Sequence, residues 1–433
     1  MPILLSIGDE LALGQTVDTN TAYLAAGLAA RGLMTRMHLT VADDRAALTA
    51  AFRHAAALAA EAEDPTRRLV IASGGLGPTE DDLTREALAE AMGVGLEADP
   101  EALAAVRAFF EGIGKAMPPR NEVQAQKPVG SALLPNPHGT APGIHARLGG
   151  ADVYVTPGVP REMKAMFGDT ILPRALGDAA AGPALATSKV STFGMGESDV
   201  SQRLAGLMRR GRNPTVGTTV AGGYCSVRLR AEAPDAAAAG SMLDAVAGEV
   251  ERALGPVCFG RDGDTLEAAT VRLLLDKHLS VTTAESCTGG LVSEMLTRVP
   301  GSSGCCRGGW VTYDNAMKSA ELGVSHAAIN EHGAVSAEVV RQMAAGAREH
   351  ARTDFALALS GVAGPGGGTP DKPVGLVWIA LAGGAGVKAW AGRFRGDRLT
   401  VRDRAAKCAL QLLRLRVLGE DTDSIQWLRA EGA

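Results

Sequence analysis

Residues 284–290, AESCTGG, place two candidate nucleophiles side by side, Ser286 and Cys287. The apolar run before them has strand length and the run after them has helical spacing, so a strand-to-helix turn is expected here. A hydroxyl or thiol at such a turn is exposed and faces backbone N–H groups that can stabilise an oxyanion. The segment therefore predicts nucleophilic catalysis by one of the two side chains.

A base for the serine is present in WVTYDNAMKSAELG, residues 310–323. Serine is a poor nucleophile without an adjacent base, and no histidine has an obvious place beside it. Lys318 lies about one turn into an expected helix, and a partly buried lysine can be kept neutral and accept the proton. Tyr313 could relay that proton or donate a hydrogen bond to the oxyanion. A solvated helix lysine and a tyrosine packed in a strand are the alternatives.

Cys287 is the alternative nucleophile, because a thiol at a helix N-terminus has a lowered pKa. Cysteine chemistry usually needs a histidine or a second charged partner close by, and the sequence shows none. We therefore expect Ser286 to react and Cys287 to pack beneath the loop.

Glycines and arginines farther along the chain are candidates for holding a phosphate. SGVAGPGGG, residues 360–368, has the glycine density expected where backbone amides surround a phosphate or ribose. Arg398 and Arg402 are natural partners for a nucleotide phosphate. Surface ion pairing with Asp397 or Asp403 is the competing interpretation of both arginines.

A second chemical signature is the acidic loop GGLGPTEDDLT, residues 74–84. Glu80, Asp81 and Asp82 follow an apolar strand-like run and precede a helical segment. Glycines and a helix N-terminus suit a phosphate, but carboxylates there would repel it unless a divalent cation lay between them. The loop therefore predicts metal-bridged phosphate chemistry. An acidic helix cap without any ligand is the alternative.

Composition restricts the class of protein. A length of 433 residues predicts two to four domains. The net charge of −5 provides no basic surface for nucleic acid, and no apolar stretch approaches the roughly 20 residues needed to span a bilayer. The first residues lack a basic segment typical of a signal peptide. The six cysteines are scattered, which argues against zinc and disulfides. We expect a cytoplasmic protein.

The elements that must position these residues form three segments. Strands at PILLSIG, MHLTVADD, RLVIASGG and ADVYVTPGVP alternate with helices at 20–30 and 44–62, which predicts a parallel sheet with ligands at its carboxyl edge. From about Thr187, the alternating strand YCSVRLRAEA and a helix at 235–254 indicate a small α+β module. A second α/β segment opens with a helix capped by Thr265 and continues through LSVTTAES, LVSEMLTRV, FALALSG and GLVWIALAG. The expected domains are 1–172, 173–257 and 258–420, with a tail at 421–433.

Residue types in these motifs resemble a known family over essentially the full length. GDELALGQTVDTN, GGLGPTEDDLT and NPHGTAPG resemble the domain shared by molybdopterin-binding proteins and the CinA (competence/damage-inducible) family. NEVQAQKPVG, TPGVPREMKAM and TFGMGESDV resemble CinA in particular, and TTAESCTGGLVSEMLTRVPGSS, VTYDNAMKSAELGV, ALSGVAGPGGGTPDKPVGLVWIA and RFRGDRLTVRDRA resemble its C-terminal domain. The resemblance implies an α/β fold class: a molybdopterin-binding-like three-layer α/β/α domain, a small α+β connector module and a C-terminal α/β deamidase domain.

For the first domain, the resemblance implies metal-dependent hydrolysis of ADP-ribose to AMP and ribose 5-phosphate. The metal would be Mg, Co, Mn or Ni, possibly with K⁺, and Asp81 and Asp82 would hold it or orient water, with Asp9 as a further ligand. Glu162 is another candidate for this site. Turn formation explains Gly139 and Gly158 equally well. The residues implied to bind the substrate are Gly8, Glu10, Asn20, Gly74, Gly75, Gly77, Thr79, Asn136, Gly139 and Thr140.

For the last domain, the resemblance implies deamidation of nicotinamide mononucleotide to nicotinate mononucleotide and ammonia, without a metal. Ser286 would attack the carboxamide, Lys318 would act as base and then acid, and Tyr313 would assist. The residues implied to bind the substrate are Thr288, Gly289, Ser360, Gly361, Gly364, Arg398 and Arg402.

The resemblance also implies a homodimer, and we expect no membrane or nucleic-acid partner. Two alternatives of other classes stay open. One is a molybdopterin-binding protein, which rests on the first domain alone. The other is a non-catalytic interaction protein associated with competence or recombination.

Overall fold

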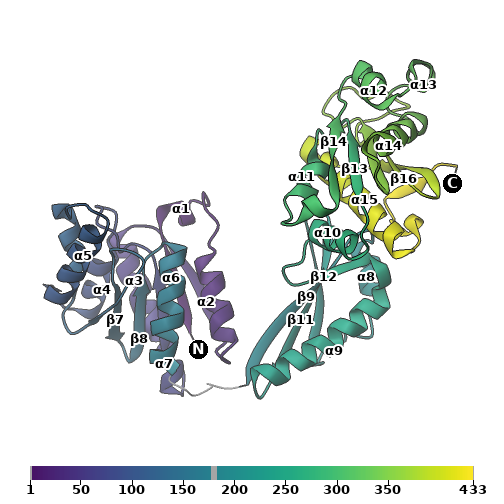
Figure 1. Ribbon diagram of the computed structural model, residues 1–433. Helices are drawn as coiled ribbons and strands as arrows, with labels where there is room; N and C mark the ends of the chain where they lie inside the picture. Colours follow the sequence, from purple (N-terminus) through teal and green to yellow (C-terminus); the bar gives the residue numbers. More distant parts are fainter. Residues whose placement is uncertain (1, 177–182, 433) are drawn as a thin grey trace. The chain divides into compact units, whose positions relative to one another are not determined.

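The computed structural model describes residues 2–176 and 183–432 (Figure 1). The chain forms two compact units, Met1–Ala186 with Ala231–Ser241, and Thr187–Arg230 with Met242–Ala433. None of the helices in the described residues is long and apolar enough to cross a membrane.

In the described residues of the first unit, six strands form one sheet in the order β2-β1-β3-β8-β7-β6. The first four strands of that order are parallel, as the alternation of strands and helices predicts. β7 and β6 then add an antiparallel edge that the sequence pattern did not predict. The strands are β1 (Ile3–Ile7), β2 (Met37–Val41), β3 (Leu69–Ser73), β6 (Ala132–Leu134), β7 (Gly143–Leu148) and β8 (Ala151–Thr156).

Helices cover both faces of this sheet, which makes the first domain a three-layer α/β/α structure (Figure 1). Alternate residues of β1 face opposite layers: Ile3 and Leu5 pack with α3 (Arg45–Ala60) and α4 (Thr84–Met92), whereas Leu4 packs with α2 (Asn20–Ala29) and α6 (Pro160–Met166). Strands buried on both faces explain the continuous apolar runs in the sequence. The other elements are α1 (Asp9–Ala12), β4 (Leu96–Ala98), α5 (Pro100–Gly112), β5 (Gln126–Pro128) and α7 (Leu172–Leu176).

A four-stranded sheet follows, in the order β10-β11-β9-β12. Along β11, residues Cys225, Val227, Leu229 and Ala231 are buried, which confirms the expected alternation. β12 belongs to this sheet, so the small module extends beyond the boundary expected at residue 257. The elements are β9 (Ala184–Thr192), α8 (Glu197–Arg203), β10 (Thr215–Ala221), β11 (Tyr224–Ala233), α9 (Ala236–Leu254) and β12 (Cys258–Arg261).

The last sheet has the order β14-β13-β15-β16-β17-β18. β14, β13 and β15 are parallel and the remaining pairs are antiparallel. β18 pairs with β17, so the segment expected as a tail at 421–433 contributes a strand to the sheet. The strands are β13 (Val281–Glu285), β14 (Cys306–Val311), β15 (Phe355–Gly361), β16 (Leu376–Gly383), β17 (Gly386–Arg393) and β18 (Leu428–Ala430).

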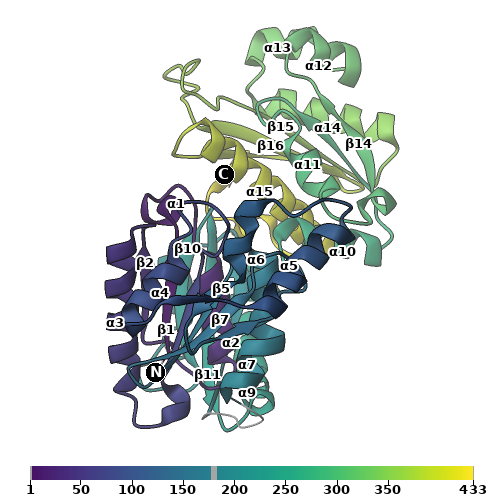
Figure 2. The same cartoon turned by 90° about the vertical axis from the view of Figure 1, so that its left-hand side faces the viewer.

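The two faces of this sheet carry side chains of different size. Leu357 and Leu359 of β15 pack in the same core as α10 (Leu266–Asp276), α11 (Leu291–Thr297) and the long α15 (Arg398–Leu418), drawn in yellow in Figure 2. Ala356 and Ala358 pack against α14 (Ala337–Ala351) on the other face, where small residues let the helix approach closely. α12 (Asn315–Leu322) and α13 (His326–His332) adjoin α14.

Candidate active sites

The loop with Ser286 leaves the carboxyl end of β13, as expected, and leads into α11. The amide of Ser286 donates to Leu359 O at 2.9 Å, which ties the start of the loop to β15. Gly289 has φ of +61° and donates from its amide to Ser286 O at 3.0 Å, so a glycine is needed for this tight turn. Ser286 itself is 9% exposed.

Lys318 reaches this serine from α12. Its Nζ lies 3.2 Å from Ser286 Oγ, 2.9 Å from Thr312 O and 3.3 Å from Tyr313 O. The residue is 1% exposed, which excludes the alternative of a solvated helix lysine. Burial lowers the pKa of Lys318, because the charged ammonium loses its hydration.

These contacts suit a lysine in its neutral form. A neutral amine has two N–H bonds and one lone pair. The two N–H bonds can be donated to the carbonyls of Thr312 and Tyr313, which leaves the lone pair to accept the hydroxyl proton of Ser286. The hydroxyl and the amine are therefore in the hydrogen-bonding contact that a serine nucleophile requires from its base.

Cys287 lies in a different environment from its neighbour. It is 5% exposed, and burial raises the pKa of its thiol to about 12. A thiol with such a pKa stays protonated at neutral pH and is a weak nucleophile. The position beneath the loop is the one expected from the sequence.

Tyr313 has a different arrangement from the one expected. Its backbone carbonyl contacts Lys318, but its side chain is 60% exposed and its hydroxyl accepts a hydrogen bond from Arg398 at 2.8 Å. Arg398 also donates to Gly364 O at 2.9 Å. The phenol is thus held by the arginine rather than by Ser286 or Lys318.

Polar atoms without partners surround the serine. Arg402 donates to Thr288 O at 2.6 Å, yet its Nε is buried and has no hydrogen-bond partner in the described residues. The same holds for Thr288 Oγ1 and Thr312 Oγ1. Such groups are costly when left unpaired, so they favour a polar ligand in this place.

Neither arginine forms the ion pair considered from the sequence. Asp397 caps α15 by accepting from the Thr400 amide at 2.8 Å, and Asp403 pairs with Lys407 at 2.7 Å. Within residues 2–176 and 183–432, Arg398 and Arg402 have only carbonyl and hydroxyl partners. Their charge is therefore not neutralised by a carboxylate.

Close packing shapes the end of β15 and the glycine-rich segment that continues from it. Ser360 Oγ donates to Ala334 O at 2.8 Å. A side chain at Gly361 would come within 2.6 Å of Leu376 O, so the strand pairing itself demands glycine here. Of the predicted residues in this loop, Gly364 is the one that contacts the site, through Arg398.

The amides in the first turn of α11 already have an acceptor within the protein. Glu285, which is fully buried, accepts from the amides of Val292 and Ser293 at 3.1 and 2.8 Å and so occupies the first turn of α11. The amides of Cys287 and Thr288 donate no hydrogen bond within the described part of the chain. These two loop amides, rather than the helix amides, are the donors nearest in sequence to Ser286.

The predicted residues of the first domain gather at the carboxyl ends of β1, β3 and β8. A cleft of about 400 Å³ opens there. This is the edge where parallel α/β sheets bind ligands. Its lining includes Gly8, Glu10, Gly74, Gly75, Gly77, Asp81, Asp82, Thr140 and Glu162.

The two neighbouring aspartates of the acidic loop differ in role. Asp82 accepts from the amides of Gly77 and Thr79 at 2.7 and 2.9 Å and from the Thr79 hydroxyl. A side chain at Gly77 would lie 2.3 Å from Asp82 Oδ2, so glycine is required for this contact. Asp81 lines the cleft with an exposed carboxylate. Asp82 thus braces the loop, whereas Asp81 is available to a ligand.

Asp43 is a cleft residue that the sequence reasoning missed. It follows β2 and lines the cleft, and its carboxylate accepts from the Asp9 amide at 2.9 Å. Asp9 Oδ1 accepts from the Asp43 amide at 3.0 Å, so Asp9 ties two loops together. Burial and the carboxylates of Asp9, Glu10 and Asp81 raise the pKa of Asp43. The sequence signal for Asp43 is the motif VADD, which places two aspartates at the carboxyl end of a parallel strand, where ligands bind.

Other predicted residues brace the cleft. Asn20 donates to Ser73 Oγ at 3.0 Å and to Gly158 O at 2.8 Å, joining the ends of β3 and β8. Asn136 donates to Glu162 Oε2 at 2.6 Å. A side chain at Gly139 would lie 2.2 Å from that same oxygen, so this glycine is required by Glu162.

A second cleft, of about 680 Å³, lies in the first domain and shares Thr140 with the first cleft. Asn136 and Gly139 line it, together with apolar residues of α5 such as Phe109. The predicted residues thus divide between two adjoining clefts.

The donor set partly fits the expected divalent metal. Oxygen ligands from Glu10, Asp43, Asp81 and Glu162 face one cleft, and hard cations prefer such ligands. Burial, with a smaller contribution from the carboxylates of Asp9, Glu10 and Asp81, raises the pKa of Asp43. However, the described residues contain no group of three or more His, Cys, Asp or Glu side chains spaced to hold a metal ion. Asp82 has both oxygens occupied, and Asp9 is absent from the lining.

The architecture defines a class of protein: a molybdopterin-binding-like domain, a small module and an α/β domain with a buried Ser–Lys pair. Family models match each of the three domains. Residues 3–176 match the family model described as probable molybdopterin binding domain, residues 187–260 the damage-inducible protein CinA KH domain, and residues 263–417 the CinA C-terminal domain.

The chain belongs to the CinA family. It is 42% identical over 415 residues to a CinA-like protein of Geobacter metallireducens, covering 96% of this chain and 98% of that one. It is 37% identical over 418 residues to a putative competence-damage inducible protein of Caldicellulosiruptor saccharolyticus, covering 96% and 99%. A solved structure of a competence/damage inducible protein from Agrobacterium tumefaciens has 38% identity and a TM-score of 0.34, covering 36% of this chain and 97% of that one.

Proposed function

We propose that the C-terminal domain deamidates nicotinamide mononucleotide to nicotinate mononucleotide and ammonia. The observation that carries the proposal is the contact of 3.2 Å between Lys318 Nζ and Ser286 Oγ inside a buried site. A serine with a desolvated lysine base is suited to attack a carbonyl carbon, and a carboxamide supplies one. The choice of this nucleotide rests on the resemblance to the CinA family.

The reaction proceeds in two halves. Ser286 Oγ attacks the carboxamide carbon while its proton passes to Lys318 Nζ, and the carbonyl oxygen becomes an oxyanion facing the loop amides of Cys287 and Thr288. The tetrahedral species then collapses, the C–N bond breaks, and Lys318 returns the proton to the leaving nitrogen, which departs as ammonia. Water attacks the acyl ester with Lys318 again as base, which releases the carboxylate product and restores Ser286.

The nucleotide phosphate is assigned to Arg402 and Arg398. Both guanidinium groups lack a carboxylate partner in the described residues, and Arg402 keeps a buried N–H without an acceptor. Such donors match phosphate oxygens. Arg398 also holds the Tyr313 hydroxyl, so the tyrosine would position the substrate rather than relay the proton.

We propose in addition that the N-terminal domain hydrolyses ADP-ribose to AMP and ribose 5-phosphate. A divalent cation bound there would neutralise the diphosphate and activate water. Asp81, Asp43 and Glu10 are the residues we assign to holding it, because their carboxylates line the cleft, while Asp82 and Asn20 keep the loops in place. The adjoining cleft with Phe109 has room for the nucleoside.

The test is to incubate the purified full chain separately with each nucleotide, with and without EDTA. Ammonia from nicotinamide mononucleotide should be unaffected by EDTA, whereas AMP from ADP-ribose should stop. Equal loss of both activities would refute the division between domains. Molybdopterin binding without ADP-ribose cleavage would favour a molybdopterin-binding protein, and absence of both activities would favour a non-catalytic interaction protein.

A further inference from the structure

A cleft of about 440 Å³ in the second unit has no part in either proposed reaction. Residues of the four-stranded sheet line one side, among them Tyr224 and Phe259, and residues of α10, α11 and α15 line the other. Ser286, Lys318, Arg398 and Arg402 are not among its lining residues. Its volume is within the range of small-molecule sites in proteins.

Glu267 is a buried acidic residue of this cleft, whose lining also contains the buried Lys407. It lies in the first turn of α10, after the cap in which Thr265 Oγ1 accepts from the Ala268 amide. The residue is 6% exposed, and its Oε2 is buried without a hydrogen-bond partner in the described residues. A buried carboxylate oxygen is costly when no donor faces it, so this atom points to a missing donor.

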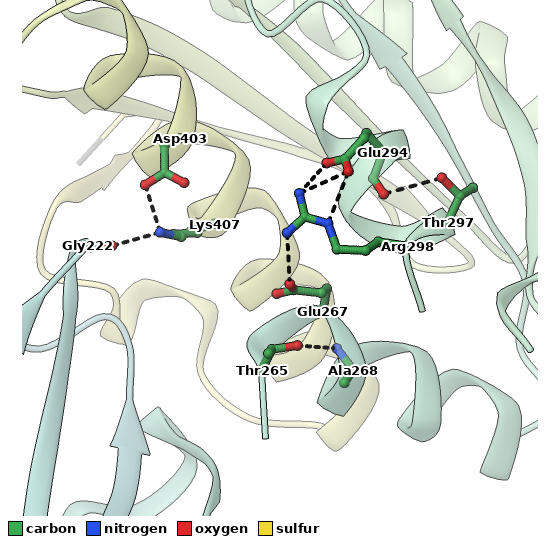
Figure 3. A network of polar contacts seen from close by, with 9 residues as sticks. All are labelled: Gly222, Thr265, Glu267, Ala268, Glu294, Thr297, Arg298, Asp403 and Lys407. Carbon is green, nitrogen blue, oxygen red and sulfur yellow. Dashed lines mark hydrogen bonds and ion pairs between the residues drawn. The ribbon is translucent and has the colours of Figure 1, made fainter. Parts of the chain in front are cut away.

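The nearest cation does not satisfy Glu267. Arg298 directs Nε and Nη2 to the carboxylate of Glu294, at 2.7–3.0 Å, and only its Nη1 approaches Glu267 Oε1, at 3.7 Å. Figure 3 shows this division, with the second oxygen of Glu267 directed to the side away from Arg298. Arg298 is therefore bound to its own helix, and Glu267 keeps one oxygen free.

Lys407, another of the three cations that line the cleft with Arg298 and Lys189, is also engaged. Lys407 Nζ lies 2.7 Å from Asp403 Oδ2 and 2.7 Å from Gly222 O, as Figure 3 shows. It also lies 4.3 Å above the Tyr224 ring. These contacts engage Lys407 with Asp403, Gly222 and the tyrosine ring. Lys189 also lines the cleft but forms no ion pair with Glu267 in the described residues, so Glu267 Oε2 stays without a donor.

Aromatic and apolar side chains complete the cleft. The Tyr224 and Phe259 rings lie with centroids 5.4 Å apart, and Met295 and Leu291 line the cleft from α11. Burial and the carboxylates of Glu267 and Asp403 raise the pKa of Tyr224, so the phenol stays neutral near these acids. A planar apolar body would find van der Waals partners here, with an acidic group at one end.

We propose that this cleft binds a small organic cation whose ammonium or amidinium N–H groups donate to Glu267 and whose apolar body packs on Tyr224, Phe259 and Met295. The remaining charged residues of the lining are Asp262, Asp264, Asp403, Lys189, Arg298 and Lys407. Asp403 is paired with Lys407 and Arg298 with Glu294, so the unpartnered oxygen of Glu267 is the feature that favours a cation. The proposal is independent of the two proposed activities.

The test uses benzamidine as the cationic probe and benzoate as the anion of the same shape, titrated calorimetrically into the full chain. Benzamidine should bind once per chain and benzoate should not bind. Glu267→Gln should weaken benzamidine at least about tenfold, since it removes the charge that faces the amidinium. Asp276→Asn is the matched control, because it removes a carboxylate from the exposed end of the same helix and should leave binding unchanged.

Two further measurements locate the probe and guard against misfolding. In spectra of methyl-labelled methionine, benzamidine should shift the Met295 resonance in both the wild type and Ser286→Ala, and nicotinamide mononucleotide should not displace it. Glu267→Gln should unfold at the wild-type temperature or above, because Oε2 has no partner to lose. Absence of benzamidine binding, equal binding of benzoate, or undiminished binding to a folded Glu267→Gln variant would overturn the proposal.

Discussion

The two candidate active sites differ in how complete they are before any ligand arrives. In the C-terminal domain, the proposed nucleophile and base are buried and already in contact, with Lys318 Nζ 3.2 Å from Ser286 Oγ. In the N-terminal domain, Asp81 and Glu10 are exposed, and both carboxylate oxygens of Asp82 accept hydrogen bonds from amides of its own loop. A site that works through its own side chains can be assembled by packing, whereas like-charged carboxylates stay apart without a cation between them.

Burial also has different effects on the pKa values of the titratable groups in the two sites. Burial lowers the pKa of Lys318, which favours the neutral amine that can act as a base. Burial raises the pKa of Cys287, which keeps the thiol beside Ser286 protonated and therefore a weak nucleophile. One environment therefore selects one of two adjacent nucleophiles. In the N-terminal cleft, burial together with neighbouring acids raises the pKa of Asp43. A bound cation would offset the repulsion between these carboxylates and lower that pKa.

The largest effect is expected from Ser286→Ala. It should reduce ammonia release from nicotinamide mononucleotide by at least about 10⁴-fold, because the protonated thiol of Cys287 cannot replace the hydroxyl. Cleavage of ADP-ribose should be unchanged, as the two sites lie in different domains. A coupled ammonia assay and AMP chromatography measure the two activities, and substantial deamidation by the variant would refute the assignment.

Lys318→Met should lower the rate of deamidation by about 10²–10⁴-fold, because it removes the general base while preserving an unbranched buried side chain. Wild-type kcat/KM should rise with pH as Lys318 loses its proton. Since burial lowers the pKa of Lys318, the midpoint should lie below about 10.4, the ordinary lysine value. The variant should lose this ionisation from its pH profile; a profile identical to the wild type would exclude Lys318 as the base.

Substitutions of the two neighbouring aspartates of the first domain should differ in their effect on thermal stability. Asp81→Asn should reduce ADP-ribose cleavage at least about tenfold and leave the thermal transition unchanged, since its carboxylate is exposed. Asp82→Asn should also lower the unfolding temperature, because an amide cannot accept all the hydrogen bonds from Gly77 and Thr79, a loss of about 1–3 kcal/mol. Calorimetric scans measure the unfolding temperatures, and AMP release measures the activity. Equal unfolding temperatures of the two variants would contradict the view that Asp82 stabilises the loop while Asp81 serves the ligand.

The smallest effect is expected from Cys287→Ser. Its thiol is buried and protonated, so the variant should keep deamidase activity to within a few-fold and should still require Ser286. Alkylation by iodoacetamide provides a second measurement, since the wild-type thiol should react slowly in the folded protein. A loss of activity as large as that of Ser286→Ala would reverse the choice of nucleophile.

Sequence patterns predicted the elements well where local periodicity controls structure. The alternation in β11, the Thr265 cap and the strand before Ser286 all follow from side-chain spacing along one element. The antiparallel edge of the first sheet and the pairing of β18 were not predicted, because short strands depend on partners far away in the sequence.

The sequence by itself determined which groups are available to react. They are a serine and a cysteine at a strand end, a lysine in a later helix, and an acidic glycine-rich loop. Only the tertiary structure decided their contacts and their burial. It brought Lys318 across 32 positions to Ser286, turned the Tyr313 hydroxyl to Arg398, and placed Asp43 in the cleft instead of Asp9. The physical reason is that contact and burial set proton affinity, and both depend on residues distant in the chain.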